Sequence, residues 1–230
     1  MIRNGIDVSE WQGAINWESV KTDFAILRAG YGRLASQTDR RFEANYRGCS
    51  EAGIPMGAYW YSYATSAEEA AQEANAFLEV VRGKRFEYPM YYDVEETGIL
   101  SLGRTRVSAI IRSFIDTLEN AGYFAGLYMS AYNLTAYTEE YIRERYALWI
   151  AEYDVSRPNY SGTYGMWQKS SSGSVDGISG SVDLDEAYED YPSIIRAAGL
   201  NGLKSDAEAP HRLTVVIDGK TIIRNQEFLL

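Results

Sequence analysis

Apolar residues follow two different periods along the first 190 residues of the chain. Short runs rich in β-branched and aromatic residues indicate strands, and segments whose apolar residues recur every three or four positions indicate helices. The expected strands lie at 4–11, 24–32, 54–64, 88–96, 123–131, 147–154, 164–171 and 182–188. The expected helices lie at 15–22, 39–53, 65–83, 104–122 and 138–146. This alternation predicts an α/β fold, a TIM-like (β/α) barrel of eight strands with an irregular last third.

Two of the expected helices carry the strongest signals. In 65–83, Ser66 is placed to cap the amino end, with Glu69 three residues later, and Gly83 is placed to end the helix. In 104–122, one face carries the apolar residues Val107, Ile110, Ile111, Phe114, Ile115 and Leu118.

The pattern changes after residue 200. Residues 201–212 are polar and predict a linker, whereas 213–230 contain two β-branched runs around Asp218-Gly219, a strong hairpin signal. We therefore expect a barrel domain at 1–200, a linker at 201–212 and a β-hairpin tail at 213–230. Because a lone hairpin is marginal in water, we expect the tail to form a homo-oligomer, to dock on another domain, or to pack on its own barrel.

Charge and residue counts exclude several classes of function. The net charge is −10 and the pI is about 4.7, so a phosphate backbone would be repelled and nucleic acid is not an expected partner. Cys49 and His211 are the only residues of their kinds, which rules out an intrachain disulfide and a zinc site built on several histidines. A Ser-His-Asp triad would have to use His211. We expect no metal and no other cofactor.

Two further absences concern membranes and export. No stretch approaches 18 apolar residues, so membrane insertion is not expected. The first residues, "MIRNGIDVSEW", lack the basic and then apolar pattern of a signal peptide.

Carboxylates are the remaining candidates for chemistry, and they gather at expected strand ends. Asp7 ends the first strand, Asp93 and Glu95 end the fourth, and Asp183 and Asp185 lie in the eighth. In a barrel of parallel strands, the carboxyl ends of the strands build the active site.

Asp93 and Glu95 are two residues apart on a strand, so their side chains should share a face with Cα atoms about 7 Å apart. Each raises the pKa of the other, and one protonated plus one ionised carboxyl is the equipment of a glycosidase. For these two residues alone, a solvated strand end or a structural ion pair is the commoner explanation. A magnesium site is another alternative.

Several separate motifs together resemble glycoside hydrolase family 25, the lysozymes of the bacterial and phage muramidase type. They are "GIDVSEWQG", "FAILRAGYG", "AGIPMGAYWYSYA", "YYDVEE", "AGLYMSAYN", "LWIAEYD" and "MWQKSSSGSVDGISGSVDLD", in the expected order over about residues 4–195. The resemblance implies an irregular barrel of eight strands with about five helices. It also implies hydrolysis of the β-1,4 bond between N-acetylmuramic acid and N-acetylglucosamine in peptidoglycan, which leads to lysis of the bacterial cell wall.

The resemblance also implies roles for the acids. Glu95 matches the general acid, Asp93 its partner carboxylate, and Asp7 and Asp183 the supporting acids of the first and last strands. Asp185 would share a face with Asp183 and ranks second to it. The family resembles retaining enzymes, and attack by an enzyme carboxylate or by the substrate's 2-acetamido oxygen both remain open.

Candidate substrate-binding residues follow from strand parity and from the resemblance. They are Tyr59, Tyr61, Tyr128, Arg28, Trp149, Trp167 and Gln168. Tyr59 and Tyr61 should share one face of their strand while Trp60 occupies the other, and Arg28 is expected to pair with the acids. For the aromatic residues, packing in the barrel core is the competing explanation.

Two other functional classes stay open at this point. One is a catalytically inactive barrel that only binds glycan, although all four matching acids are present. The other is an assembly protein whose hairpin is the functional part. If the enzyme reading holds, the protein acts on the bacterial cell wall, either as a phage endolysin released through a holin or as a secreted enzyme trimmed of its leader.

Overall fold

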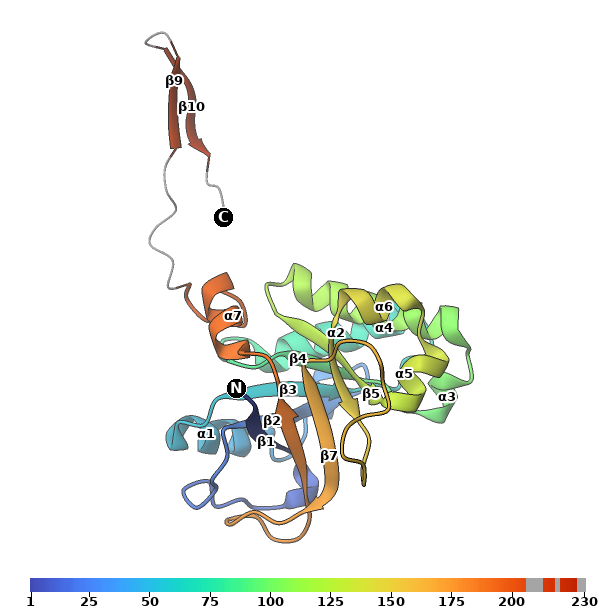
Figure 1. Cartoon of the computed structure of the whole chain (residues 1–230). Helices are drawn as coiled ribbons and strands as arrows, with labels where there is room; N and C mark the ends of the chain where they lie inside the picture. Colours follow the sequence, from blue (N-terminus) through green and yellow to red (C-terminus); the bar gives the residue numbers. More distant parts are fainter. Residues whose placement is uncertain (206–212, 218–219, 227–230) are drawn as a thin grey trace.

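Eight strands close into a single barrel in the order β1 to β8 (Figure 1). The computed structural model describes residues 1–205 and, for the tail, the backbone of 213–217 and 220–226. The strands are β1 (Arg3–Val8), β2 (Phe24–Tyr31), β3 (Met56–Tyr61), β4 (Met90–Asp93), β5 (Ala125–Ser130), β6 (Ala147–Ala151), β7 (Met166–Gly173) and β8 (Val182–Ala187). The predicted eight-stranded α/β barrel is confirmed.

The direction of the last strand differs from the expectation of a parallel barrel. Strands β1 to β7 pair in parallel, but β8 is antiparallel to both β7 and β1. The reason is that β7 and β8 are joined by a hairpin loop at 174–181 instead of a crossover helix. The start of β8, and not its end, therefore lies at the carboxyl end of the other strands, where Asp7 pairs with Asp183.

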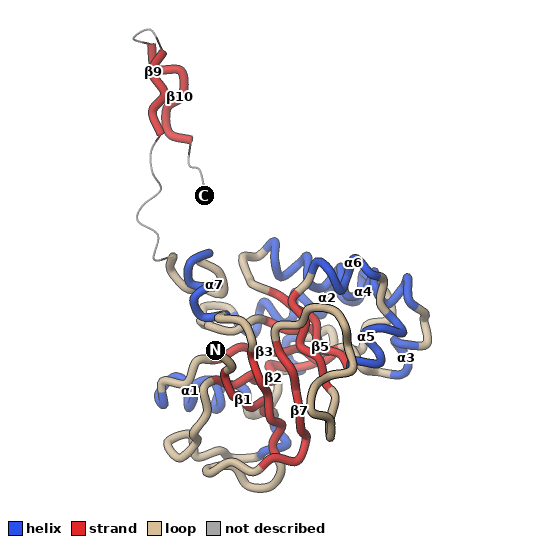
Figure 2. The backbone as a smooth tube through the Cα atoms, in the orientation of Figure 1, coloured by secondary structure: helices blue, strands red, loops and turns tan. Residues whose placement is uncertain are grey.

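Helices surround the earlier strands, while loops border β7 in the same view (Figure 2). The seven α-helices in the described part are α1 (Phe42–Ala52), α2 (Ala67–Val81), α3 (Thr97–Leu100), α4 (Arg104–Asn120), α5 (Ala131–Tyr137), α6 (Glu140–Arg145) and α7 (Tyr191–Ala198). The cap of α2 is as predicted, because the Ser66 hydroxyl accepts a hydrogen bond from the Glu69 backbone at 3.2 Å. Helices α3, α5 and α7 are additional to the five expected segments.

One expected helix is wrong. Residues 15–22 form a turn and not a helix. The Trp17 ring is buried and packs where a side chain at Gly48 of α1 would otherwise stand. The Asn16 backbone N–H donates 2.8 Å to the carbonyl of Gly177, so tertiary contacts outweigh the local helical period here.

Strand parity divides the core into two layers. Trp60 stacks on Phe77 of α2, and Tyr92 stacks on Phe114 of α4, so these rings lie between the barrel and its helices. The alternate residues point into the barrel. An inner cluster fills it with Phe24, Ile26, Tyr88, Tyr91, Trp149 and Tyr191, among others. The interior is therefore packed toward the amino ends of the strands, and polar groups occupy the carboxyl end.

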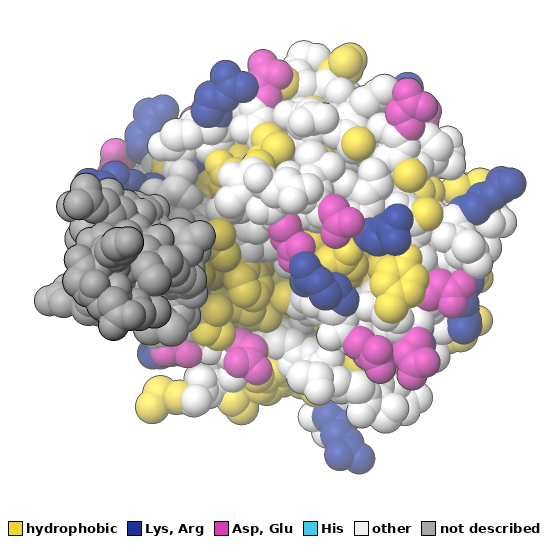
Figure 3. All heavy atoms as spheres, turned by 90° about the horizontal axis from the view of Figure 1, so that it is seen from above, with side chains coloured by type: hydrophobic (Ala, Val, Ile, Leu, Met, Phe, Trp, Pro, Cys, Tyr) yellow, Lys and Arg dark blue, Asp and Glu magenta, His cyan; other side chains and the backbone are white. Residues whose placement is uncertain are grey.

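The outer surface at the amino ends of the barrel strands carries both acidic and basic side chains. Figure 3 looks down on the molecule from above Figure 1, whereas the β7–β8 loop lies at the bottom of Figure 1. Acidic and basic side chains are interspersed over this face.

Within residues 1–205, no helix has both the length and the apolar character needed to cross a membrane.

The first residues of the expected linker pack on the barrel. The Asn201 side chain is buried, donates 2.9 Å to the Tyr88 carbonyl and accepts 2.7 Å from the Phe124 backbone. Beyond them, β9 (Leu213–Ile217) and β10 (Lys220–Gln226) pair antiparallel as a separate two-stranded sheet. The turn residues Asp218-Gly219 and residues 206–212 and 227–230 lie outside the described residues. The docking partner of the tail stays a prediction.

Candidate active site

Inward-facing carboxylates from three strands meet at the carboxyl end of the barrel. Asp7 is the next-to-last residue of β1, Asp93 ends β4, and Asp183 and Asp185 lie in β8. Asp7 is 3% exposed, Asp93 5% and Asp185 1%, which is uncommon for carboxylates. Glu95 follows β4 at the rim of the same site, where its side chain is open to solvent. All the acids expected from the sequence are thus brought together.

Asp7, Asp183 and Asp185 form a trio of neighbouring carboxyls. Asp7 lies within hydrogen-bonding reach of both β8 carboxyls. Burial, and then the charges of Asp185 and Asp183, hold the pKa of Asp7 well above its usual range. Burial raises the pKa of Asp183 to about 6 and that of Asp185 to about 8. The trio therefore keeps a proton at neutral pH, because neighbouring carboxyls in a buried site do not all ionise.

Gln168 fixes the orientation of this trio. Its Nε2 donates to Asp7 Oδ2 at 2.7 Å, and its Oε1 accepts from the hydroxyls of Tyr128 at 2.7 Å and Tyr153 at 2.6 Å. Asp7 Oδ2 is consequently an acceptor, and both phenols use their protons on Gln168. Tyr128 can offer a ligand its oxygen lone pairs while this network is intact.

Trp149 also belongs to the support of the acids. Its ring is buried, and the centroids of the Trp149 and Tyr128 rings are 4.5 Å apart. Its Nε1 donates a hydrogen bond of 2.9 Å to Asp185 Oδ1. This is a structural contact, so Trp149 does not present a free face for stacking on sugar. Trp167 points to the other side of β7, packs in the outer core and donates to the Glu152 carbonyl at 2.8 Å. The structure does not bring Trp167 to the acids.

Asp93 and Glu95 form the second half of the site. Burial, and then the charge of Glu95, hold the pKa of Asp93 well above its usual range, while Arg28 opposes this. Asp93 Oδ1 is buried and has no hydrogen-bond partner among the described residues. Desolvation at the rim and the charge of Glu96 raise the pKa of Glu95. The two carboxyls therefore tend to keep a proton between them.

Two tyrosines of β3 line the site as strand parity predicts. Tyr59 is partly buried and meets Trp149 edge to face, at 6.0 Å between ring centroids. The Tyr61 hydroxyl donates 2.8 Å to Glu96 Oε1 and lies within hydrogen-bonding reach of Glu95. Tyr61 thus holds the segment that follows β4.

Arg28 does not pair with the inner acids, contrary to the expectation. Its Nε donates 2.6 Å to Asp39 Oδ2, and its Nη2 donates 2.7 Å to Glu10 Oε1. Both partners come from loops outside the barrel interior, and neither pairing is visible in local sequence patterns. The positive charge of Arg28 nevertheless lowers the pKa of Asp93.

Three residues of this cluster were not predicted from the sequence or were ranked below the others. Asp185 is the most buried acid of the site, and its parity with Asp183 was the available signal. Tyr153 follows β6 within the quoted motif "LWIAEYD". Glu96 accepts from Tyr61, and its place in "YYDVEE" gave no indication of that contact.

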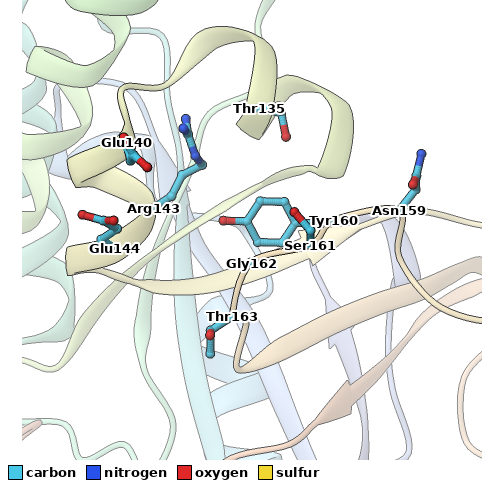
Figure 4. A pocket seen from close by; sticks show the side chains of 9 residues that line it. All are labelled: Thr135, Glu140, Arg143, Glu144, Asn159, Tyr160, Ser161, Gly162 and Thr163. Atoms are coloured by element: carbon cyan, nitrogen blue, oxygen red, sulfur yellow. The ribbon is translucent and has the colours of Figure 1, made fainter.

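A hollow of about 790 Å³ lies away from the acids (Figure 4). Its walls are Thr135, Glu140, Arg143, Glu144, Asn159, Tyr160, Ser161, Gly162 and Thr163. Arg143 and Tyr160 lie side by side there; burial raises the pKa of the Tyr160 phenol, and the arginine charge opposes this rise. No site acid lines this hollow, so its volume does not make it the reaction centre.

The arrangement suits general acid catalysis of the cleavage of a bond to an uncharged leaving oxygen. A protonated carboxyl at an open rim can give a proton to a leaving oxygen, and a nearby carboxylate can stabilise the positive charge that develops. Across the part of the chain that is described, no group of three or more His, Cys, Asp and Glu has the arrangement of a metal site.

Comparison with known proteins agrees with this geometry. The sequence model of the Glycosyl hydrolases family 25 matches residues 6–178. The chain is 34% identical over 191 residues to the Autolytic lysozyme of Clostridium acetobutylicum, covering 80% of this chain and 56% of that protein. It is 33% identical over 201 residues to Lysozyme M1 of Streptomyces globisporus, covering 79% of this chain and 66% of that one. The chain thus spans less than two thirds of these relatives.

Solved structures give the same result. The bacterial lysozyme from Streptomyces coelicolor superposes with a TM-score of 0.73 at 30% identity, covering 89% of this chain and 97% of that one. The autolysin LytC from Streptococcus pneumoniae, in complex with a synthetic peptidoglycan ligand, superposes with a TM-score of 0.70 at 29% identity, covering 81% and 47%. The family match over most of the barrel and the identity with these relatives lead to one conclusion: the chain belongs to glycosyl hydrolase family 25.

Proposed function

We propose that this protein is a lysozyme that hydrolyses the β-1,4 bond between N-acetylmuramic acid and N-acetylglucosamine in peptidoglycan. The carrying observation is the Asp93–Glu95 pair at the mouth of the barrel, where desolvation raises the pKa of both carboxyls and the charge of Glu95 raises that of Asp93 further. The relatives named lysozymes and the peptidoglycan ligand of LytC support this choice of substrate.

Glu95 is the general acid of the proposal. Its side chain reaches the rim, where a leaving oxygen can meet it, and partial desolvation and then the charge of Glu96 favour its protonated form. Burial and the charge of Glu95 raise the pKa of Asp93, and Arg28 opposes this rise and so favours the charged form. The proposal places the donated proton on Glu95, because the leaving oxygen reaches the rim, and places the negative charge beside the developing oxocarbenium ion on Asp93.

Asp93 also has a free acceptor for the substrate. Its buried Oδ1 has no partner within the described residues, and an unpaired buried oxygen is costly. An N–H of a bound 2-acetamido sugar would satisfy it. Asp7 and Asp183, with Asp185, form the wall behind the reacting sugar, and Gln168 and Tyr128 hold that wall in place.

The test is to digest purified cell walls and identify the new reducing ends. Turbidity loss measures lysis, and borohydride reduction followed by mass spectrometry identifies the reduced sugar. The proposal expects reduced N-acetylmuramic acid. Reduced N-acetylglucosamine as the sole product would identify a glucosaminidase, and binding without any new ends would identify an inactive glycan-binding barrel.

A further inference from the structure

A second hollow, of about 740 Å³, lies at the same end of the barrel as the acids. Its walls are the segment after β2, the segment after β3 and the first turns of α2. The lining residues are Gly32, Arg33, Leu34, Gln37, Tyr63, Thr65, Glu69 and Gln72. None of them is part of the acid cluster.

A row of tyrosines connects this hollow to the reaction centre. Tyr61, which donates to Glu96, lies 5.2 Å from Tyr63 between ring centroids, and Tyr63 lies 6.1 Å from Tyr31, edge to face. Burial first, and then the charge of Glu96, raise the pKa of the Tyr63 phenol. The Tyr63 side chain is 52% exposed. A polymer that is bound at the acids and extends toward the end of β3 would therefore pass over the Tyr63 ring.

Hydrogen bonds hold the backbone at the floor of the hollow in one conformation. The Gly32 backbone N–H donates 3.1 Å to the Tyr61 carbonyl, and the Gly32 carbonyl accepts 2.8 Å from Trp60 Nε1. Gly32 has a φ of +67°, and a Cβ there would lie 2.7 Å from the Gln37 amide. Pockets that bind small polar ligands are usually preformed in this way.

The chemistry of the walls suits a neutral ligand. Arg33 and Glu69 are the only charged residues of the lining, and they pair with each other at 2.9 Å. Gln37 uses its Oε1 to accept from the Leu34 backbone, which leaves its amide N–H groups for a ligand. The Gln72 side chain forms no hydrogen bond to any described residue. Amide groups beside an exposed aromatic ring match the polar edges and apolar faces of a sugar.

We propose that this hollow is a sugar-binding subsite for the glycan strand, one or more units away from the bond that is cleaved. The inference rests on the proposed function, because it assigns the hollow to the same polymer. It commits to sugar and not to the stem peptides of peptidoglycan, since their free charges would find no unpaired opposite charge in the hollow.

Three variants test the assignment. Tyr63→Ala removes the ring, Tyr63→Phe keeps it, and Tyr141→Ala removes a similarly exposed tyrosine of α6 that does not line the hollow. We would measure kcat/KM on peptide-free glycan strands of increasing length. Losing one stacked ring should lower kcat/KM on long strands about three- to tenfold. The shortest strand that the wild type cleaves should be unaffected, and Tyr63→Phe and Tyr141→Ala should stay close to wild type.

Several results would overturn the assignment. An equal loss on short and long strands would place Tyr63 at the reaction centre, and no loss on either would leave the ring without a role in binding. A loss seen only on strands that still carry stem peptides would assign the hollow to peptide. A wild type that cleaves no strand of any length would contradict the proposed function and this inference together, whereas each of the other results overturns the inference alone.

Discussion

Replacing Asp185 by Asn should change how the stability of this protein depends on pH. Asp185 is 1% exposed, and burial raises its pKa from 3.8 to about 8. Between these pH values the folded state binds more protons than the unfolded state, so the free energy of unfolding falls as pH rises. Above the folded pKa, the full cost of ionising the buried carboxyl is present.

The magnitude follows from the two pKa values. The cost grows by about 1.4 kcal/mol for each pH unit above 3.8, which gives about 4 kcal/mol near pH 7. Asp185→Asn removes this cost because the amide is neutral at every pH. Its Oδ1 can keep the 2.9 Å hydrogen bond from Trp149, and its N–H groups replace the carboxyl proton beside Asp7.

Urea unfolding of the wild type and of Asp185→Asn at a series of pH values is the assay. The two proteins should have similar stability near pH 4, and the variant should become progressively more stable than the wild type toward pH 8. Parallel stability curves across this range would refute the reasoning, because they would mean that Asp185 is charged in the folded protein at ordinary pH.

Three further outcomes follow from other parts of the structure. Glu73 is fully buried and accepts hydrogen bonds from Ser62, Tyr92 and the Tyr63 backbone. Glu73→Ala should therefore lower the free energy of unfolding by about 3 kcal/mol or more, measured by thermal or urea unfolding. A loss below about 1 kcal/mol would show that the network contributes little. Excess EDTA should leave the rate of wall digestion unchanged; activity that is lost and then restored by magnesium would contradict the proton-based account. Light scattering should show a larger particle for the full chain than for a version ending at Ser205, if the hairpin assembles; two monomers would exclude an oligomer.

The alternation of periods was enough to predict the barrel and the inward face of its strands. Tyr59 and Tyr61 share a face, as predicted, because residues two apart on a strand always do. The same rule brings Asp183 and Asp185 to one face, and it holds whichever way the strand runs. The direction of β8 did not follow from periodicity, since a Ser/Gly-rich loop can belong to a hairpin or to a crossover.

The contacts of individual site residues were harder to predict than their faces. Arg28 finds Glu10 and Asp39, which lie 18 and 11 residues away, because loops after β1 and β2 fold over the same strand end. Trp149 and Trp167 occupy opposite layers of the core and carry hydrogen bonds that depend on partners distant in sequence. Such pairings depend on tertiary structure, which a period of two or 3.6 residues does not specify.

The most direct test of the central claim is the rate at which Glu95→Gln releases muropeptides from purified walls, measured beside the wild type under single-turnover conditions. The amide keeps the size of the side chain and cannot donate the proton. The rate should therefore fall by about 10²- to 10⁴-fold, while the thermal unfolding of the variant stays close to that of the wild type. Release at a near-normal rate by a folded Glu95→Gln protein would contradict the assignment of Glu95 as the general acid.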